Sequence, residues 1–580
     1  MITNQGQIQS LNDLTLTSDE LTNSGDISSL NQATLTQTST LTSSGNIHAD
    51  GDATVEAKTL TLETESELIG GNVTLNADTL VQDGVVNAEQ TLNVTATTVE
   101  IRGDIGSEHD TTFNVDYLTQ TANSTVNTNG NLTLTDAHTL TQSGEINAKS
   151  SITLEAEQIT IGGALNAEHD VTVEADRLAL SSQVIANRDI NITTQSDLNA
   201  QKDLIAGRNL TLSAGSLDNN AEITSTGTTQ INVSGTLTNQ QDAVISGFNT
   251  ELTSNTAFNY GVLQALADLQ LNAADTTNYG ALIALNNAQT NLTGTLTNRG
   301  VIYAGNNGYL YANTLSNYSD VLTLNDLTIA KNAELEKSVN LYNSSGRLES
   351  IGNVSIYTKV LTNSRTDLSI EADMSNDISS EYPLIYDANN TTHMSTKVER
   401  QCPSYAPCED VEVYDPSTAK HRPTLQRVCG PLGVCVYAVL DGATFTVPVL
   451  TESEYLQSAS SPAYLVATNE LTIMAEEVEN NASHIAGKEV VVDAKHLANI
   501  GYDLSDTSVY YDYEIRGNDH PEGMTHPDVD GVFYKTLCDW GAVLLQVLAT
   551  MNLYLIEWVY AWLITDREAN LTLLSPLRVT

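Results

Sequence analysis

The chain has 580 residues and a formal net charge of −48, because 72 acidic residues stand against 24 Lys and Arg. So large an excess of acid excludes the basic surface that a nucleic-acid backbone or an anionic lipid membrane requires. The chain is too long for one compact core, and its low contents of charge (17 %), Pro (11) and Phe (5) fit neither a disordered polymer nor an aromatic core. We therefore expect a core of stacked aliphatic side chains.

The first residues, MITNQGQIQSLNDLTLT, contain no basic n-region, no apolar stretch and no cleavage site of a secretory signal. We therefore expect this sequence to be an internal piece of a longer protein.

A repeat of about 19 residues follows, and it is clearest between residues 144 and 180. Seven apolar positions recur after a shift of 19, namely Ile146, Ala148, Ile152, Leu154, Ala156, Ile159 and Ile161, which become Leu165, Ala167, Val171, Val173, Ala175, Leu178 and Leu180. Within each unit the apolar residues alternate with polar ones, which is typical of half-buried strands. The pattern predicts three short strands in each unit.

Stacking such units buries their apolar positions and predicts an all-β fold, a right-handed parallel β-helix. The period holds from about residue 6 to 373, which corresponds to roughly 19 coils and about 90 Å at the usual spacing between strands. Gly recurs at the expected turns, where we expect it to supply positive φ. The glycines concerned are Gly6, Gly25, Gly45, Gly84, Gly144, Gly261, Gly280 and Gly300.

Two other repeat folds do not fit the sequence. Leucine-rich repeats would show a helical return segment, and no period of 3.6 residues is visible in these units. A calcium-binding β-roll needs Gly-Gly-x-Gly-x-Asp nonapeptides, which do not occur.

The repeat resembles a known family. The segments AGRNLTLSAGSLDNN (Ala206 to Asn220), GVIYAGNNGYLYANTLSNYS (Gly300 to Ser319) and ASHIAGKEVVVDAKHLANIG (Ala482 to Gly501) are similar to the haemagglutinin repeats of filamentous haemagglutinins and contact-dependent growth-inhibition exoproteins of Gram-negative bacteria. The resemblance covers residues 6–373 and 468–501. It implies export by an outer-membrane two-partner transporter, a surface filament, and adhesion or delivery of a toxin to a neighbouring cell. We identify neither the family's N-terminal secretion domain nor a C-terminal toxin.

The composition predicts five segments. These are β-helical repeats (1–375), an insertion containing Cys, Pro and Tyr (376–467), resumed coils (468–501), a polar Tyr-rich segment (502–535) and an apolar C-terminal segment (536–580). Insertions between coils are often the binding elements of solenoids, and a purely structural spur is the alternative.

The apolar stretch 540–565, WGAVLLQVLATMNLYLIEWVYAWLIT, is long enough for a membrane helix. A buried apolar helix and a frame-shifted tail are the alternatives.

Four of the five cysteines form two closely spaced pairs, Cys402 with Cys408 and Cys429 with Cys435, and the fifth is Cys538. Each pair encloses five residues, whereas zinc sites usually have two to four between paired ligands. Because an exported protein favours disulfides, we expect two local bridges, with a zinc site as the alternative.

Two short motifs carry weaker signals. Arg102-Gly103-Asp104 matches an adhesion tripeptide, but Gly is expected at that turn in any case. Glu-His-Asp occurs at residues 108–110 and 168–170, three coils apart, which is too far for one shared metal ion. We therefore expect no metal and no cofactor, and we infer no glycosylation from the numerous Asn-x-Ser/Thr sequons, which follow from composition.

The sequence favours a structural and adhesive stalk at the surface of a Gram-negative cell, without catalytic residues. A stalk fragment of a polymorphic toxin is the first alternative. A β-helical carbohydrate-active enzyme is the second, and it would need a carboxylate or basic cluster on adjacent coils that we do not find.

Overall fold

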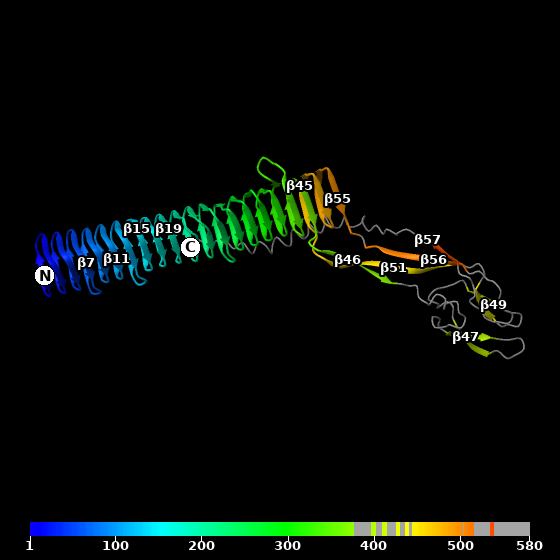
Figure 1. Ribbon diagram of the computed structural model, residues 1–580, viewed down its shortest axis with the longest axis horizontal. Helices are drawn as coiled ribbons and strands as arrows, with labels where there is room; N and C mark the ends of the chain where they lie inside the picture. The colour runs from blue at the N-terminus through cyan, green and yellow to red at the C-terminus, as the bar shows by residue number, and fades with distance from the viewer. Residues whose placement is uncertain are drawn as a thin grey trace. The chain divides into compact units, whose positions relative to one another are not determined.

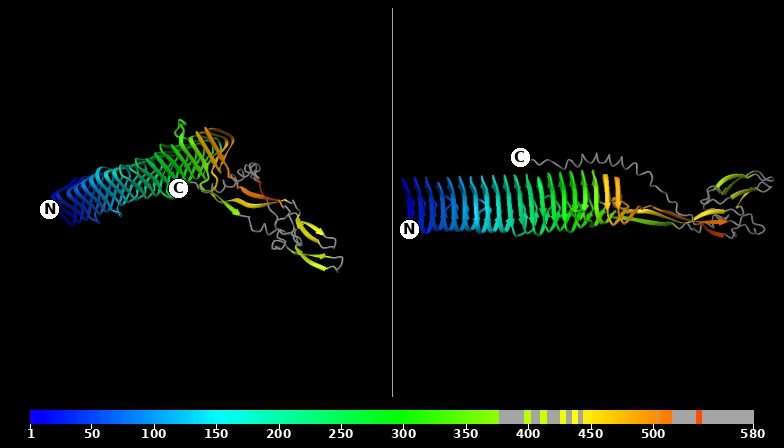
Figure 2. Two further views of the ribbon diagram at one scale, coloured as in Figure 1. Left: turned by 45° about the vertical axis from the view of Figure 1, so that its right-hand side comes forward. Right: turned by 90° about the horizontal axis from the view of Figure 1, so that it is seen from above.

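The computed structural model describes residues 1–375, 444–502 and 504–514, and the backbone of five short strands between residues 396 and 538. Contacts divide the chain into two units. The first comprises Met1–Thr366 and Ser460–Gly501, and the second comprises Asp367–Ala459 and Tyr502–Thr580. Figures 1 and 2 show the stacked coils of the first unit.

The first unit is a parallel β-solenoid in which 49 strands are hydrogen-bonded into one network. Its strands stack in three columns, which we call sheets 1, 2 and 3. Sheet 1 consists of short strands: β2 (Gln7–Ser10), β4 (Asp26–Ser29), β6 (Asn46–Ala49), β8 (Glu67–Gly70), β10 (Val85–Ala88), β12 (Asp104–Ser107), β14 (Thr125–Thr128), β16 (Glu145–Ala148), β18 (Leu165–Ala167), β20 (Val184–Ala186), β23 (Leu204–Ala206), β26 (Glu222–Ser225), β29 (Val244–Gly247), β32 (Val262–Ala265), β35 (Ala281–Ala284), β38 (Val301–Ala304), β41 (Asp320–Thr323) and β44 (Arg347–Ser350).

In the first half of the solenoid, sheets 2 and 3 share long strands. After β1 (Ile2–Asn4) these are β3 (Leu14–Asn23), β5 (Ala33–Ser43), β7 (Ala53–Leu62), β9 (Val73–Gln82), β11 (Leu92–Ile101), β13 (Thr111–Gln120), β15 (Leu132–Gln142), β17 (Ile152–Ile161) and β19 (Val171–Leu180).

In the second half, sheets 2 and 3 separate. Sheet 2 continues with β21 (Ile190–Thr194), β24 (Leu210–Ala214), β27 (Thr228–Val233), β30 (Asn249–Thr253), β33 (Leu269–Ala273), β36 (Ala288–Leu292), β39 (Gly308–Tyr311) and β42 (Leu327–Ala330). Sheet 3 continues with β22 (Leu198–Ala200), β25 (Leu217–Asn219), β28 (Thr236–Asn239), β31 (Thr256–Asn259), β34 (Asp275–Asn278), β37 (Thr295–Asn298), β40 (Thr314–Asn317) and β43 (Ser338–Ser344).

The strand arrangement partly corrects the expected three strands in each unit. In β17 the inward-facing Ala156 and Ile159 are separated by two outward residues, and the backbone stays extended through them. Two expected strands therefore merge in each coil up to β19, whereas the polar turn between Thr194 and Leu198 keeps β21 and β22 apart.

The register confirms the period of 19. All seven residues from Ile146 to Ile161 pair with the residues expected one coil later, for example Ile152 with Val171 and Ile159 with Leu178. All of these side chains are buried, so the solenoid has a continuous aliphatic interior.

Glycine is required at the turns of the repeat for a different reason from the one expected. No described glycine has a φ in the left-handed region. Instead, a Cβ at Gly280 would lie 2.0 Å from the carbonyl oxygen of Gly261, and one at Gly25 would lie equally close to the carbonyl oxygen of Gly6. Close stacking of successive turns therefore excludes larger residues there.

The solenoid resumes in register after a long excursion of the chain. The strand β52 (Tyr464–Met474) pairs with β44 and with β45 (Val354–Ser364), and Arg347 lies opposite Tyr464. The strands β53 (Glu477–Asn481), β54 (His484–Asp493) and β55 (His496–Ile500) complete the next coils. Figure 1 shows β55 stacked beyond β45.

The second unit is antiparallel where it is described. Its sheet has the order β46 (Leu368–Ser375), β51 (Thr444–Ala459), β56 (Asp506–Glu514) and β57 (Tyr534–Cys538). Two hairpins pair β47 (Thr396–Gln401) with β48 (Glu409–Tyr414) and β49 (Leu425–Cys429) with β50 (Cys435–Val439).

Two expected features lie outside the described residues: the loop holding Cys402 and Cys408, and the apolar helix of 540–565. The part of the chain that the structure describes contains no helix able to cross a membrane.

Candidate functional site on the outer face of sheet 1

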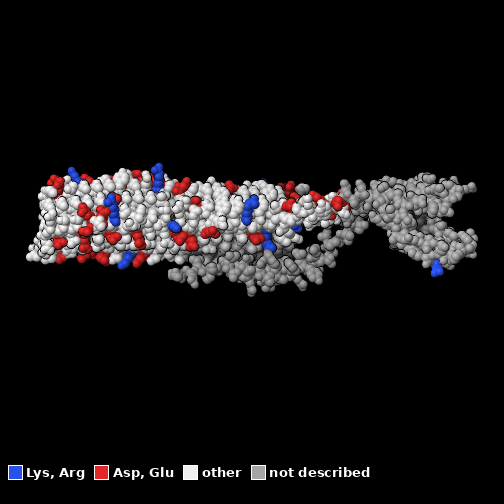
Figure 3. Space-filling view, turned by 90° about the horizontal axis from the view of Figure 1, so that it is seen from below, with Lys and Arg blue, Asp and Glu red and all other residues white. Residues whose placement is uncertain are grey.

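The outer face of sheet 1 changes its chemistry along the solenoid. Each sheet 1 strand is entered from sheet 3 through turn A, for example Tyr260-Gly261, and leaves to sheet 2 through turn B, for example Leu266 to Asp268. The two inward residues of each strand are fixed by the core, so the outer residues and both turns are free to vary. Figure 3 views one side of the protein, where acidic side chains outnumber basic ones.

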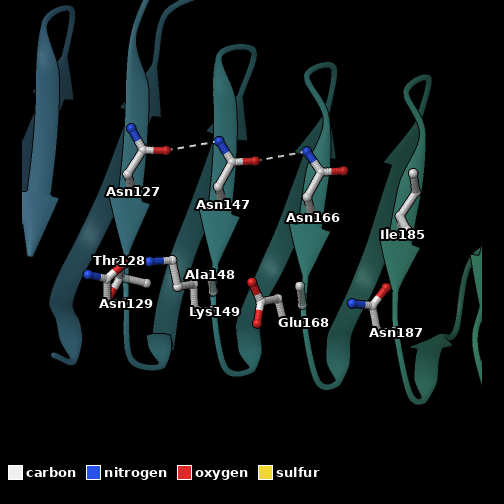
Figure 4. Close-up of a pocket in the computed structure, with 11 residues that line it drawn as sticks. Asn127, Thr128, Asn129, Asn147, Ala148, Lys149, Asn166, Glu168, Ile185 and Asn187 are labelled. Carbon is white, nitrogen blue, oxygen red and sulfur yellow. Dashed lines mark hydrogen bonds between the residues drawn. The ribbon is translucent and has the colours of Figure 1, made fainter. Parts of the chain in front are cut away.

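A hollow of about 360 Å³, lined mainly by polar residue types, lies on this face across β14, β16, β18 and β20. Its floor is a ladder of amides, in which Asn147 Nδ2 donates to Asn127 Oδ1 and Asn166 Nδ2 donates to Asn147 Oδ1, both at 2.9 Å. Figure 4 shows these three side chains in one row, with Ile185 at the next position. The ladder arises because one outward strand position carries Asn on three successive coils.

The turn B residues Asn129, Lys149, Glu168 and Asn187 form the rim of the hollow (Figure 4). They add one ammonium and one carboxylate group to the amide row, which suits a polar ligand with several hydroxyl groups. Glu168 is the only carboxylate among the lining residues, whereas glycoside hydrolysis ordinarily uses two. The lining offers amide, ammonium and carboxylate groups to a polar ligand, and the Glu145 carboxylate lies beside it, accepting from Asn166 Nδ2 at 3.3 Å.

A second region of the same face is apolar, and we call it the aromatic face. It comprises Phe248, Tyr260, Leu266, Tyr279, Leu285, Val301, Tyr318 and Leu324, all exposed. They occupy turn A, turn B and an outer strand position on successive coils. Large apolar side chains exposed together are characteristic of interaction surfaces.

A stack of planar groups runs along turn A of the aromatic face. The rings of Tyr260 and Tyr279 lie parallel, with centroids 5.0 Å apart and an interplanar angle of 4°. At the same turn two coils further on, the Arg299 guanidinium lies 4.3 Å from the centroid of the Tyr318 ring. Regular coil stacking thus aligns side chains that are 19 or 20 residues apart.

The adhesion tripeptide lies at turn A and the start of β12. The Arg102 guanidinium is 2.7 Å from Glu100 and 3.6 Å from Asp83. Asp104 accepts a hydrogen bond from the Thr125 hydroxyl at 2.7 Å. Both charged ends are therefore engaged within the solenoid, and adhesion through this tripeptide stays a prediction.

The two Glu-His-Asp motifs both lie at turn B, three coils apart. Their acids make separate contacts: Asp110 accepts from Asn131, and Asp170 accepts from the Asp189 backbone N–H. Among the described residues, no three or more His, Cys, Asp or Glu side chains are grouped so as to hold a metal ion.

The backbone brings one cysteine pair together. Cys429 and Cys435 are register partners at the end of the β49–β50 hairpin. Partners in an antiparallel pair lie about 4.5–5.5 Å apart at Cα, within the range that disulfides span. The positions 402 and 408 lie outside the described residues, next to Gln401 and Glu409, which are also register partners.

Sequence reasoning missed both regions of the outer face. The signal for the aromatic face is present, because Tyr or Arg precedes a turn Gly at residues 260, 279 and 299. The hollow's signal is Asn at positions 127, 147 and 166, which repeats at the coil period. Both signals can be detected only if the outward positions of successive coils are compared with one another, as the inward positions were.

Comparison with known proteins supports the resemblance. The haemagglutinin repeat model matches residues 1–64, 68–116, 106–175, 166–241 and 457–505. The 16S rRNA endonuclease CdiA of Enterobacter cloacae is 30 % identical over 237 residues, which is 38 % of this chain and 7 % of that protein. The tRNA nuclease CdiA of Escherichia coli O6:K15:H31 is 34 % identical over 112 residues, which is 19 % of this chain and 4 % of that protein.

The matched region is thus a small part of each relative, and no solved structure matches the chain. The haemagglutinin repeats, the parallel solenoid built from them and the likeness to CdiA proteins place this chain in the family of filamentous haemagglutinins and contact-dependent growth-inhibition exoproteins.

Proposed function

We propose that this chain is part of a stalk that holds a binding or toxic module away from a Gram-negative cell. The observation that carries the proposal is the unbroken register of sheet 1, which runs from β2 to β54 with one aliphatic interior. Such a solenoid is a stiff spacer, because each coil contacts only its neighbours and adds a fixed length.

We further propose that the solenoid is right-handed and that an outer-membrane two-partner transporter exports the protein to the cell surface. The family supports both statements. The acid excess supports a soluble surface rod and disfavours nucleic acid as a partner. The second unit, with its two hairpins, is the candidate binding element, and a structural spur is the alternative.

The stalk itself is proposed to have no enzymatic activity. The nuclease activities in the names of the CdiA proteins belong to those proteins, and the matched segments make up only 7 % and 4 % of them. Their likeness favours a second candidate function, the stalk of a contact-dependent inhibition toxin. A small immunity gene directly downstream that protects cells against the full-length protein would support that candidate over a host-cell adhesin.

Deleting whole coils tests the stalk proposal. Ala33, Ala53 and Val73 are register partners on successive coils, so removal of residues 33–72 joins the chain in register. We expect the shortened chain to fold and the full-length parent protein carrying the deletion to retain its cell binding. Removal of residues 33–62 is the control, because it joins the chain out of register. We expect this deletion to unfold the neighbouring coils. If the in-register deletion folds but abolishes binding, those coils contain a site and are not a passive spacer.

A further inference from the structure

We propose that two copies of this protein pair side by side through the aromatic face. This inference goes beyond the stalk function, which would hold for a single rod. It rests on the distribution of exposed apolar side chains, on charge, and on the geometry of the stacked rings.

Exposed large apolar residues become frequent on the outside of the solenoid from Phe248 onward, and beyond residue 330 they include Tyr342 and Ile351. Between residues 31 and 247, Tyr117 is the only one, whereas residues 248–330 contain all eight members of the aromatic face. Both stretches have a largely aliphatic interior, and within residues 248–330 it also contains buried Asn and Thr side chains. The outer residues of 248–330 therefore serve something other than the stability of the coil.

The charge of this stretch favours contact between copies. Residues 248–330 contain five acidic residues, whereas residues 48–130, a stretch of equal length, contain fourteen. Two rods that each carry −48 repel each other along most of their surface. Repulsion is weaker at the aromatic face than over residues 48–130, so a second copy can approach more easily there.

The ring geometry favours a protein partner over a sugar. Sugars bind to exposed ring faces, but Tyr260 and Tyr279 turn their faces toward each other and Arg299 covers Tyr318. One ring face of each of these three tyrosines is thus covered, and Phe248 and the aliphatic chains add exposed apolar surface beside Arg299. Aromatic residues and Arg are enriched in protein–protein interfaces, and Asp and Glu are depleted.

Charge complementarity and the area that pairing would bury also favour a second copy of this chain as the partner of the aromatic face. Arg299 and Asp320 lie on neighbouring coils, so a two-fold axis between them sets each cation against the partner's acid. The four aromatic side chains are 51, 43, 47 and 37 % exposed in chain order, or roughly 300–400 Å² in total. With the four aliphatic residues each copy offers roughly 600 Å², so a pair buries roughly 1,200 Å², the lower end for specific interfaces.

Sedimentation velocity of the full 580-residue chain tests the pairing. We expect a monomer–dimer equilibrium with a micromolar Kd that tightens as salt is raised, because salt screens the repulsion between acidic rods. The variants Tyr279→Glu and Leu285→Glu place a carboxylate in the face and should weaken the dimer at least about tenfold. Both residues are exposed, so the coil itself has no reason to unfold.

Two matched controls lie off the aromatic face. Tyr117 is 46 % exposed against 47 % for Tyr279, and it stacks on His138 as Tyr279 does on Tyr260. Leu30 occupies turn B as Leu285 does and is 50 % exposed against 46 %. Tyr117→Glu and Leu30→Glu should leave the dimer unchanged.

End-to-end stacking is a different mode of association that the same experiment separates. The exposed Leu497 on β55 belongs to the last coil described, and Leu497→Lys should leave lateral pairing unchanged. A chain that remains monomeric at high concentration and high salt contradicts the proposal. So does a dimer that Leu497→Lys dissociates while Tyr279→Glu and Leu285→Glu leave it intact.

Discussion

The side-chain amide of Asn259 donates a hydrogen bond of 2.8 Å to the Oδ1 atom of Asn278, its counterpart one coil later. Both amides are fully buried at the end of sheet 3. The same contact repeats from coil to coil through Asn219, Asn239, Asn259, Asn278, Asn298, Asn317, Asn343, Asn363, Asn480 and Asn499. The second amide N–H bonds a backbone carbonyl, as from Asn259 to Ala281, so the buried donors are used.

Interrupting this ladder should destabilise the surrounding coils. In the variant Asn278→Leu, the amide of Asn259 loses its acceptor and the Oδ1 atom of Asn298 loses its donor. Each of the two buried unsatisfied groups costs about 1–3 kcal/mol, so local stability should fall by about 2–6 kcal/mol. The size of the introduced Leu would not explain this loss of stability, because Leu62 and Leu180 fill the same position in other coils. Faster amide hydrogen exchange in β34 and β37 is the measurement, and the exposed Asn255→Leu is the control.

An acid placed in the aliphatic interior should be far more harmful than one outside. Val173 is completely buried between Leu154 and Ile192, so Val173→Asp buries an unpaired charge at a cost of about 3–5 kcal/mol. The neighbouring Thr172→Asp faces outward and should cost little. Urea unfolding followed by far-UV circular dichroism compares the two, and equal midpoints would contradict a solid interior.

Adding a methyl group at a stacked turn should destabilise the solenoid, because the Cβ would clash with the preceding coil. Gly280→Ala would place Cβ 2.0 Å from the carbonyl oxygen of Gly261, which must then move. The same change at Gly6, at turn A of the first coil, meets nothing within 4 Å. We expect a lower unfolding midpoint for Gly280→Ala and no change for Gly6→Ala. Similar midpoints would show that the turns adjust easily.

One carboxylate gives the solenoid a testable pH dependence. Burial raises the pKa of Glu349, and the nearby Asp320 adds to this, while Arg347 opposes it. A carboxyl group with a raised pKa binds its proton more tightly in the folded state, so its ionisation destabilises the fold as pH rises through that pKa. Glu349→Gln should therefore stabilise the coil modestly at neutral pH. The difference from the wild type should disappear below the pKa of the unfolded chain, and an unchanged difference at acidic pH would contradict this assignment.

The cysteine pairs should be bridged in the exported protein. Cys429 and Cys435 are backbone register partners across their hairpin, and we expect a second bridge between Cys402 and Cys408. Peptide mass mapping without reduction should find both. Each bridge closes a small loop and contributes only about 2 kcal/mol. Free thiols or bound zinc in the exported protein would exclude these bridges.

The sequence predicted the solenoid well because its interior repeats strictly. The positions from Ile146 to Ile161 face inward, and inward positions must match the residue above, so the register could be read from a shift of 19. The turn glycines were identified correctly, but their cause was not, because φ is a local property while the contact between Gly280 and Gly261 joins two coils.

The outer face and the Asn ladder were harder to predict from the sequence. Outward residues have no partner that constrains them, so Tyr260 and Tyr279 look like isolated surface residues until the register aligns them. The ladder has a clear signal in the Asn that closes each sheet 3 strand. It was missed because Asn at the end of a strand also fits an ordinary turn residue.

The Asn ladder has a consequence for how such proteins can diversify. It passes directly from Asn363 to Asn480, although 116 residues separate the two in sequence. The coils on either side of this excursion are therefore joined as if it were not there. A different module could be inserted between the coils of Asn363 and Asn480 without changing the rod, provided that its two ends join these coils in the same register. Recombination among related genes could then alter what the protein carries and leave its length and stiffness unchanged.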